Sequence, residues 1–359
     1  MLQVARPAGR DRVKGGSDMK KRDRRPFLKD LFTKKPLAGA GLVFMILLFV
    51  LAILADYVAP YPMVDGAMQL DVFNKMQKPY LFMTAAERES AQVLLSVSGG
   101  VPHWLGTDTL GRDVLSYLIY GARTSIILCV SCCILSTLIS VIIGTLSAVI
   151  GGWFDLIVQR FVDGWQCIPS MLMLLVIMSM LGNGVPQLVF ALSVPSGIGG
   201  SRMIRAAAMS VKDAGYNKQS DLLGGTVMWK TLKHVIPNIL PIIIITAAGS
   251  LAGVILMESS LSFLGYGVDI GTPSWGYLIS NQGKSYMYVA PWLAFAPGAA
   301  IAVTVFAANM FGDGVRDLLD PRLKGGVGSY DSGKIAKKVA RLTGILPERM
   351  PGQKKAEQA

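Results

Sequence analysis

Long uninterrupted runs of apolar residues constrain this fold more than any other feature of the sequence. A transmembrane helix needs roughly 20 mostly apolar residues, because about 30 Å of hydrocarbon must be crossed at about 1.5 Å per residue. The chain of 359 residues is 52% hydrophobic and only 16% charged, which is too apolar for an ordinary soluble domain. The runs are continuous and do not alternate, so they predict helices and not a β-barrel. The sequence therefore predicts an all-α polytopic membrane protein.

Six runs are long enough, or nearly long enough, to cross a bilayer. The third contains Arg160 and Asp163 and the fourth is short, so five spans remain an alternative. The predicted spans cover residues 37–57, 125–150, 156–181, 185–200, 235–261 and 289–311.

The distribution of Lys and Arg predicts the orientation. Twelve Lys and Arg residues precede the first span, against four Asp, so the N-terminus is predicted to be cytoplasmic. With six spans, the basic loop at 202–233 and the basic tail after Arg316 are then cytoplasmic, and segments 60–122 and 265–288 lie outside. The formal net charge of +12 is attributed to this topology and to attraction by anionic lipid, and not to nucleic-acid binding.

Four zones follow along the chain. Residues 1–36 form a basic tail, 37–122 hold the first span and an outside segment, 123–313 hold a core of five spans with a cytoplasmic loop at about 201–234, and 314–359 form a polar tail. In the outside segment, Thr84 and Glu87 have the spacing of a capping box and predict a short helix over residues 85–96.

No enzymatic or cofactor chemistry is predicted for this chain. Cys129, Cys132 and Cys133 share one helix face, but no His, Asp or Glu lies near them in sequence, so packing is favoured over a metal site. Residues 328–334 have the spacing of a phosphate loop, yet Ile335 stands where Ser or Thr would hold Mg²⁺. The chain is predicted to be non-catalytic, with no cofactor and no metal.

Two acidic residues within spans are candidates for a transport pathway, because an unpaired charge in hydrocarbon costs at least about 2.5 kcal/mol. Asp163 follows Arg160 by three residues, so a local ion pair is favoured over a translocation role. Glu258 has no partner nearby in sequence, and both packing and a pathway role remain open. Gly144 and the Gly249 and Gly253 pair predict close helix packing.

The cytoplasmic loop between the fourth and fifth spans predicts two short helices. Asn217 can cap the first, the pair Gly224 and Gly225 ends it, and Thr226 can cap the next. The first would run over Lys218, Gln219, Ser220, Asp221, Leu222 and Leu223. Its two leucines are exposed at the turn, where they would either enter a groove on a soluble protein or lie on the bilayer surface.

Several segments together resemble one family. They are HWLGTDTLGRDVLSYLIYGAR at 103–123, GGWFDLIVQRFVDGWQCIPSM at 151–171, the loop at 211–241, ESSLSFLGYGV with PSWGYLI, and FGDGVRDLLDPRL at 311–323. In order, over about 290 residues, they look like the dipeptide/oligopeptide permease subunits of bacterial ABC importers, and like the second permease of the pair.

The resemblance implies a type I ABC importer membrane domain in the bacterial inner membrane. It also implies the partners: a sister permease, two ATP-binding subunits and an extracytoplasmic peptide-binding protein. Gly224, Pro237 and Asn238 match the family's coupling motif, which makes residues 217–225 the implied ATPase-coupling site. Where the family usually has Glu-Ala-Ala, this chain has Lys218-Gln219-Ser220, so the charge of the ATPase groove must differ or coupling is weaker.

Some alternatives stay open at this stage. Relatives of this kind carry dipeptides, longer peptides or nickel chelates, and a self-sufficient secondary carrier or a scaffold without transport remains conceivable. Asp108, Arg112 and Asp113 precede the second span in a predicted turn, where a local ion network is favoured over contact with the binding protein.

Overall fold

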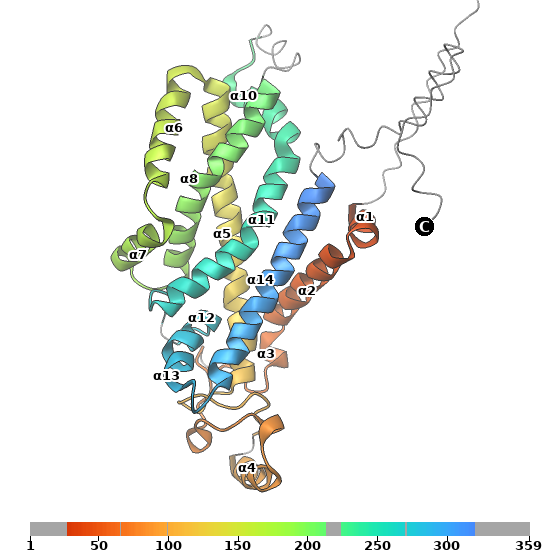
Figure 1. The fold of residues 1–359 in the computed structure, drawn as a ribbon, viewed down its shortest axis with the longest axis vertical. Helices are drawn as coiled ribbons and strands as arrows, with labels where there is room; N and C mark the ends of the chain where they lie inside the picture. The colour runs from red at the N-terminus through yellow and green to blue at the C-terminus, as the bar shows by residue number, and fades with distance from the viewer. Residues whose placement is uncertain (1–26, 65, 99, 213–223, 270, 320–359) are drawn as a thin grey trace, which may run out of the picture.

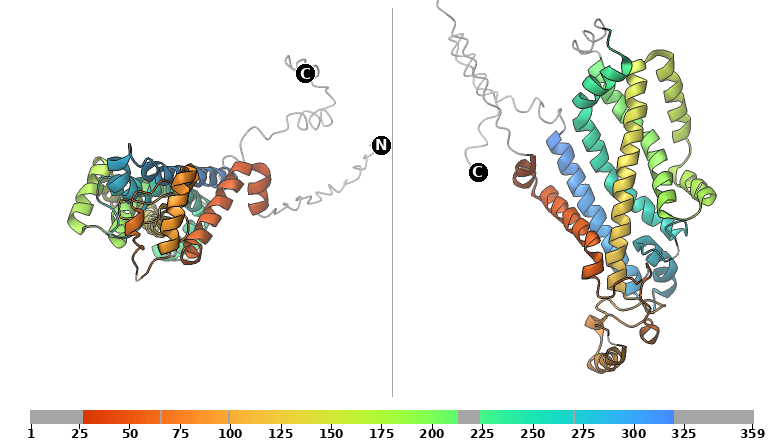
Figure 2. Two further views of the ribbon diagram at one scale, coloured as in Figure 1. Left: turned by 90° about the horizontal axis from the view of Figure 1, so that it is seen from below. Right: turned by 180° about the vertical axis from the view of Figure 1, so that it is seen from behind.

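The computed structural model describes residues 27–64, 66–98, 100–212, 224–269 and 271–319, and within these ranges every regular element is a helix. Helix α5 (Val114–Ile150), 37 residues long, runs the length of the bundle, and the other long helices lie along it (Figures 1 and 2). One end of the bundle carries α4 (Ala85–Ser98) and is called the α4 end; the opposite end carries α10 (Val227–Lys230) and is called the α10 end.

The remaining elements follow in chain order. The first are α1 (Phe27–Lys34), α2 (Pro36–Ile53), α3 (Ala55–Val58), η1 (Val72–Asn74) and η2 (Tyr80–Phe82). After α5 come α6 (Gly152–Gln166), α7 (Ser170–Leu181) and α8 (Val185–Lys212). The last are η3 (Thr231–Val235), α11 (Ile236–Phe263), α12 (Trp275–Leu278), η4 (Ile279–Gly283), α13 (Lys284–Tyr286) and α14 (Trp292–Leu319).

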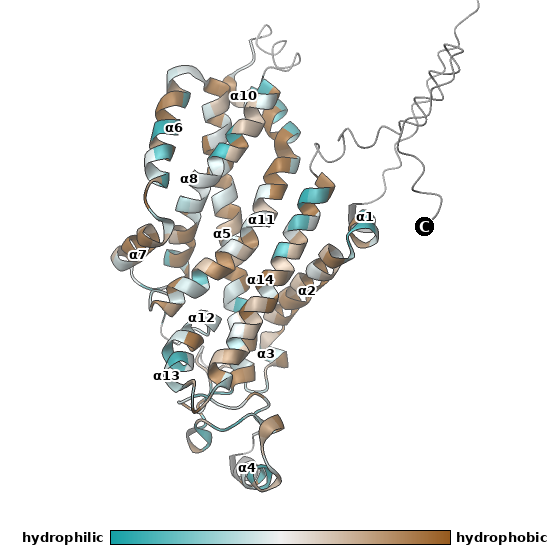
Figure 3. Ribbon diagram, viewed as in Figure 1, coloured by the Kyte–Doolittle hydropathy of each residue, from teal (hydrophilic) through white to brown (hydrophobic). Residues whose placement is uncertain are grey.

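Four stretches of helix are long and apolar enough to cross a membrane, and their exposed faces are predominantly hydrophobic (Figure 3). They are Pro36–Ile53, Val114–Ile150, Val227–Phe263 and Trp292–Leu319, the third being one continuous helix through η3. They confirm the all-α membrane fold and correspond to the predicted first, second, fifth and sixth spans. The second begins at Val114 and not at residue 125, because the Asp113 carboxylate accepts a hydrogen bond from Ser116 N at 2.7 Å and caps the helix there.

The predicted third span is not one helix. It is divided into α6 and α7, which meet at 88° around Pro169. Proline lacks the backbone N–H that would continue the helix and restricts the residue before it, so the break lies where the sequence contains Ile168-Pro169. Together the two helices are apolar enough for one broken span or a re-entrant loop.

The helix that contains the predicted fourth span is longer than the apolar run at 185–200. Helix α8 continues 12 residues beyond Gly200 to Lys212 and includes Arg202 and Arg205. The prediction from hydropathy ended at residue 200 because charged residues follow it. A helix can continue through charged residues when these pair with side chains of neighbouring helices.

Close contact between α5 and α8 forms the centre of the bundle. A Cβ added at Gly144 on α5 would lie 2.6 Å from the Ser201 carbonyl oxygen of α8, so only glycine permits this approach. Helix α11 packs against α14, and α14 against α2. A Cβ added at Gly249 or Gly253 would meet nothing within 4 Å in the described part of the chain. Gly249 nevertheless lies close to α14, since a Cβ added at Gly312 would be 3.5 Å from its Cα, whereas Gly253 differs from the close packing predicted for it.

The α4 end is a cap of short helices and turns below the bundle (Figure 1). The predicted capping box of α4 is confirmed: Glu87 Oε2 accepts a hydrogen bond from Thr84 N at 2.8 Å, and Glu87 N donates to Thr84 Oγ1 at 3.4 Å. Hydrogen bonds from the Lys78 ammonium and from Thr84 lower the pKa of Glu87 to about 2. Burial also raises the pKa of Tyr61, which lies in the same cap, to about 12.

Candidate functional site

The segment predicted to couple to an ATPase follows α8 and precedes α10 in the sequence, and α10 lies at the α10 end of the bundle (Figure 1). Asn217, Lys218, Gln219, Ser220, Asp221, Leu222 and Leu223 lie outside the described residues. The described residues resume at Gly224, whose φ of +75° lies in the left-handed region that favours glycine. Thr226 then caps α10, accepting a hydrogen bond from Trp229 N at 3.2 Å.

Helix α10 is joined to α11 without a break. The connecting turn, η3, is π-helical, an uncommon geometry that places one extra residue in a turn. Pro237 lies in the first turn of α11, and Asn238 Nδ2 donates to the His234 carbonyl oxygen at 2.6 Å. Residues Val227–Phe263 therefore form one continuous helix.

Asp163 is paired with two arginines. Its carboxylate lies 3.3 Å from Arg160 Nη1 on the same helix and also contacts Arg202 Nη2 on α8. The first pair follows the predicted spacing of three residues. Arg202 is 39 residues away in sequence, so local spacing could not identify it.

A second ion pair joins α6 to α8 nearer the α10 end, and the sequence analysis missed it. Arg205 Nε lies 2.6 Å from Asp155 Oδ1, and Arg205 Nη2 lies 2.5 Å from Asp155 Oδ2. Ser147 on α5 donates to the same carboxylate, and Gln159 Nε2 donates to Ser147 Oγ at 3.0 Å. The cluster connects α5, α6 and α8 next to Lys212, whose Nζ donates to the Ala148 carbonyl oxygen at 2.8 Å.

Glu258 lies inside the protein and not on an open surface. It is only 2% exposed, and its Oε1 accepts hydrogen bonds from Ser262 Oγ at 2.9 Å and Ser274 Oγ at 2.8 Å. Ser259 Oγ donates to Oε2 at 3.3 Å. The carboxyl group thus ties α11 to the start of α12.

Asp108, Arg112 and Asp113 form a buried polar cluster at the α4 end. Arg112 Nε lies 2.6 Å from Asp108 Oδ2, and Gln282 Nε2 donates to the same oxygen at 3.1 Å. Asp113 Oδ1 lies 3.0 Å from His103 Nδ1. Neither His103 nor Gln282 was predicted to take part; Gln282 belongs to the π-helical turn η4, more than 170 residues from its partner.

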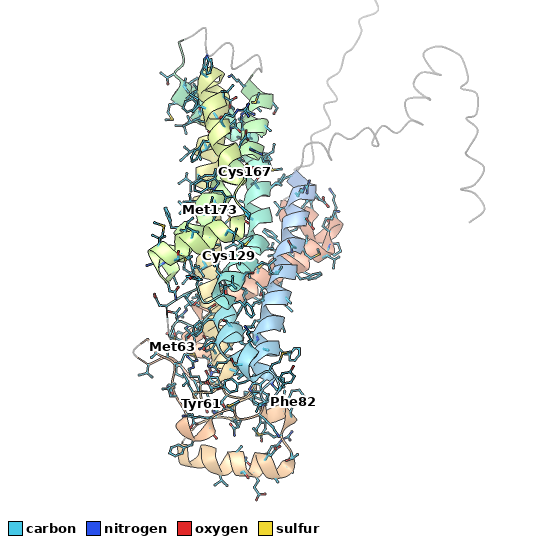
Figure 4. The ribbon with its side chains drawn as sticks, turned by 60° about the vertical axis from the view of Figure 1, so that its left-hand side comes forward. Tyr61, Met63, Phe82, Cys129, Cys167 and Met173 are labelled. Atoms are coloured by element: carbon cyan, nitrogen blue, oxygen red, sulfur yellow. The ribbon has the colours of Figure 1, made fainter. Side chains whose placement is uncertain are left out.

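The three cysteines of α5 face neighbouring helix backbones. Cys129 Sγ donates to the Leu251 carbonyl oxygen at 3.6 Å, and Cys133 Sγ to that of Ala247 at 3.4 Å. Among the described residues no cluster of His, Cys, Asp and Glu could hold a metal ion. Cys167, by contrast, is exposed at the C-terminal end of α6 (Figure 4).

Comparison with known proteins identifies two family matches in chain order. Residues 30–79 match the "N-terminal TM domain of oligopeptide transport permease C", and residues 103–325 match the "Binding-protein-dependent transport system inner membrane component".

Individual relatives extend these matches over most of the chain. The "Probable peptide ABC transporter permease protein y4tQ" of Sinorhizobium fredii is 33% identical over 90% of this chain and 98% of its own length. The "Oligopeptide transport system permease protein OppC" of Bacillus subtilis is 36% identical over 62% of this chain and 72% of its own length. The "Glutathione transport system permease protein GsiD" of Escherichia coli O6:K15:H31 is 30% identical over 82% and 89%. Through these matches, the chain belongs to the family of inner membrane components of binding-protein-dependent transport systems.

Proposed function

We propose that this chain is a permease subunit of an ABC importer for di- or oligopeptides, and that it forms half of the membrane pathway. The observation that carries the proposal is the similarity over 98% of the length of a probable peptide ABC transporter permease. The consecutive matches to an oligopeptide permease N-terminal domain and to the inner membrane component add support.

In this proposal the α10 end faces the cytoplasm and the α4 end faces outward. The basic N-terminal tail, residues 1–36, supports a cytoplasmic N-terminus. Six spans then result if the α6 and α7 pair counts as one and α8 as another. The zones 37–122, 123–313 and 314–359 remain proposals, although their boundaries after residues 122 and 313 fall within α5 and α14.

The proposed partners are a sister permease, two ATP-binding subunits and an extracytoplasmic peptide-binding protein. The ATPases bind the coupling loop at about 201–234, with residues 217–225 at the contact. ATP binding moves this loop, α10 and η3 transmit the movement to α11, and the cavity opens outward; hydrolysis reverses the change. Hydrolysis takes place in the partners, and this chain is not an enzyme.

The test is to purify the tagged chain from its native membrane in mild detergent and to measure peptide uptake by the same complex in liposomes. We expect a second permease and two ATPases at comparable stoichiometry, and uptake that requires ATP and a binding protein. Flux through this chain alone would indicate a self-sufficient carrier. An isolated chain without flux in several detergents would indicate a scaffold.

A further inference from the structure

An exposed group of charges lies across α6 and α8. The side chains of Arg160, Asp163 and Arg202 are 76%, 43% and 45% exposed, and Asp163 contacts both arginines. Two guanidinium groups and one carboxylate leave one positive charge uncompensated within this cluster. At about 1.5 Å per residue, Arg202 lies roughly 15 Å along α8 from its end at Lys212, well inside the length of the bundle.

The break between α6 and α7 lies beside these charges. Gln166, Cys167, Ile168, Pro169 and Ser170 are all exposed. Gln166 Nε2 donates to the Gly199 carbonyl oxygen of α8 at 3.3 Å, so the break lies against the same helix as Arg202.

A groove of about 410 Å³ opens at the break. Apolar and polar groups share its wall, which includes Trp165, Gln166, Ser170, Pro195, Ser196 and Met257. Trp165 Nε1 is buried and has no hydrogen-bond partner among the described residues, so it remains available as a donor. Gln166 lines the groove, belongs to the break and bonds to α8, so the charges, the break and the groove are neighbours and are together called the break face.

Lipid tails would be a poor environment for the break face. Irregular backbone at membrane depth is tolerated only where protein buries it or where it lines a water-filled cavity. Exposed arginines in hydrocarbon cost at least about 2.5 kcal/mol each, and such residues characteristically face a bundle interior or an aqueous pathway.

Resting on the proposed function, we propose that the break face is a wall of the cargo pathway and that Arg160 and Arg202 bind the carboxylate of the passing peptide. Guanidinium groups bind carboxylates through paired, charge-assisted hydrogen bonds, and each arginine retains N–H donors beyond those that reach Asp163. Asp163 holds the two guanidinium groups together and prevents them from binding the anion too tightly for release. The groove accommodates apolar parts of the cargo beside them.

Cys167 provides a native probe, because it is exposed within the break while Cys129 and Cys132 are buried. The experiment measures labelling of the intact importer by a membrane-impermeant maleimide in inside-out vesicles without nucleotide, with Cys167→Ser giving the background. We expect Cys167 to react, and millimolar alanyl-alanine to slow the reaction more than its C-terminal amide does. Arg202→Gln should raise the protecting concentration of the free acid about tenfold, while Arg316→Gln, an exposed arginine on α14, should leave it unchanged.

Two results would overturn the assignment while leaving the proposed function intact. One is a Cys167 that resists labelling in a complex that still imports peptide, which would mean that the sister permease covers the break face. The other is equal protection by the free acid and the amide, which would remove the role of the arginines. Failure of the proposed function itself would be recognised separately, as absence of ATP-dependent uptake by the wild-type complex.

Discussion

Arg205 of α8 binds both carboxylate oxygens of Asp155 of α6, at 2.6 Å from Nε and 2.5 Å from Nη2. The two side chains are 26% and 18% exposed, so solvent screens the pair only in part. Lysine cannot reproduce this two-point geometry. We expect Arg205→Lys to destabilise the packing of α6 on α8 by about 1–2 kcal/mol. This is the contribution of one charge-assisted hydrogen bond, reduced because the pair is partly exposed.

The measurement is thermal unfolding of the purified protein in detergent, with Arg316→Lys on α14 as the matched control. Arg316 is exposed, so its replacement should leave the midpoint unchanged. An equal midpoint for wild type and Arg205→Lys would show that the pair contributes nothing to stability.

Glu258 accepts hydrogen bonds from three serine hydroxyls. Its replacement tests whether the buried carboxyl group stabilises the fold. Glu258→Gln keeps the shape and an accepting oxygen, so we expect a loss of stability of no more than about 1 kcal/mol. Glu258→Ala leaves a cavity and removes the acceptor of Ser262 and Ser274, so we expect a loss of about 2 kcal/mol or more. Unfolding midpoints of the two variants give the comparison, and Ser260→Ala on the exposed face of α11 is the control. Normal stability with lost uptake in Glu258→Gln would instead assign Glu258 to the pathway.

Local signals in the sequence predicted local structure well. The capping box of Thr84 and Glu87 and the pairing of Arg160 with Asp163 depend on spacings of three residues, which a helix fixes by its own geometry. The four long apolar helices follow from hydropathy over windows of similar length.

Contacts between distant segments could not be predicted in the same way. Asp155 and Arg205 are 50 residues apart, and Asp108 and Gln282 are 174 apart, so only the tertiary fold brings them together. The break between α6 and α7 is a different case. Its signal, Pro169, was present in the sequence, but the hydropathy of the run outweighed it.

Gly144 and Gly253 distinguish close helix packing from an open surface. A methyl group at Gly144 would meet Ser201 O at 2.6 Å and Arg205 N at 2.9 Å, both backbone atoms that cannot move aside cheaply. We expect Gly144→Ala to cost about 1–3 kcal/mol by forcing α5 and α8 apart. Gly253→Ala, with nothing within 4 Å in the described part of this chain, should be neutral or slightly stabilising through its helix propensity. Detergent unfolding of the isolated chain compares them, and equal midpoints would contradict the packing of α5 on α8.

The low pKa of Glu87 predicts acid sensitivity of α4. A carboxyl group whose pKa falls to about 2 on folding stabilises the helix fully above its unfolded pKa of about 4.5, and this contribution is lost as the pH falls towards 2. We expect the ¹³C carboxyl resonance of Glu87 to titrate with a midpoint near 2, and Lys78→Met to raise that midpoint, because the ammonium of Lys78 is the largest cause of the shift. A midpoint near 4.5 in the wild-type protein would show that neither Lys78 nor Thr84 holds the carboxylate in solution.

Gly224 tests whether the segment before α10 transmits force. Glycine adopts the φ of +75° found at this position without strain, whereas alanine would adopt it at a cost of about 1–2 kcal/mol. Proline cannot adopt it, because its ring fixes φ near −65°. If this turn couples an ATPase to α11, Gly224→Pro should abolish peptide uptake by the assembled importer while ATP hydrolysis continues, and Gly224→Ala should reduce uptake in part. Gly253 on α11 is the control, because it lies outside the coupling loop and an added Cβ would meet nothing within 4 Å in the described part of the chain, so Gly253→Ala should transport normally. Uptake and ATPase rates measured on the same proteoliposomes separate the outcomes. Wild-type uptake by Gly224→Pro at normal expression would mean that the movement reaches α11 by another route.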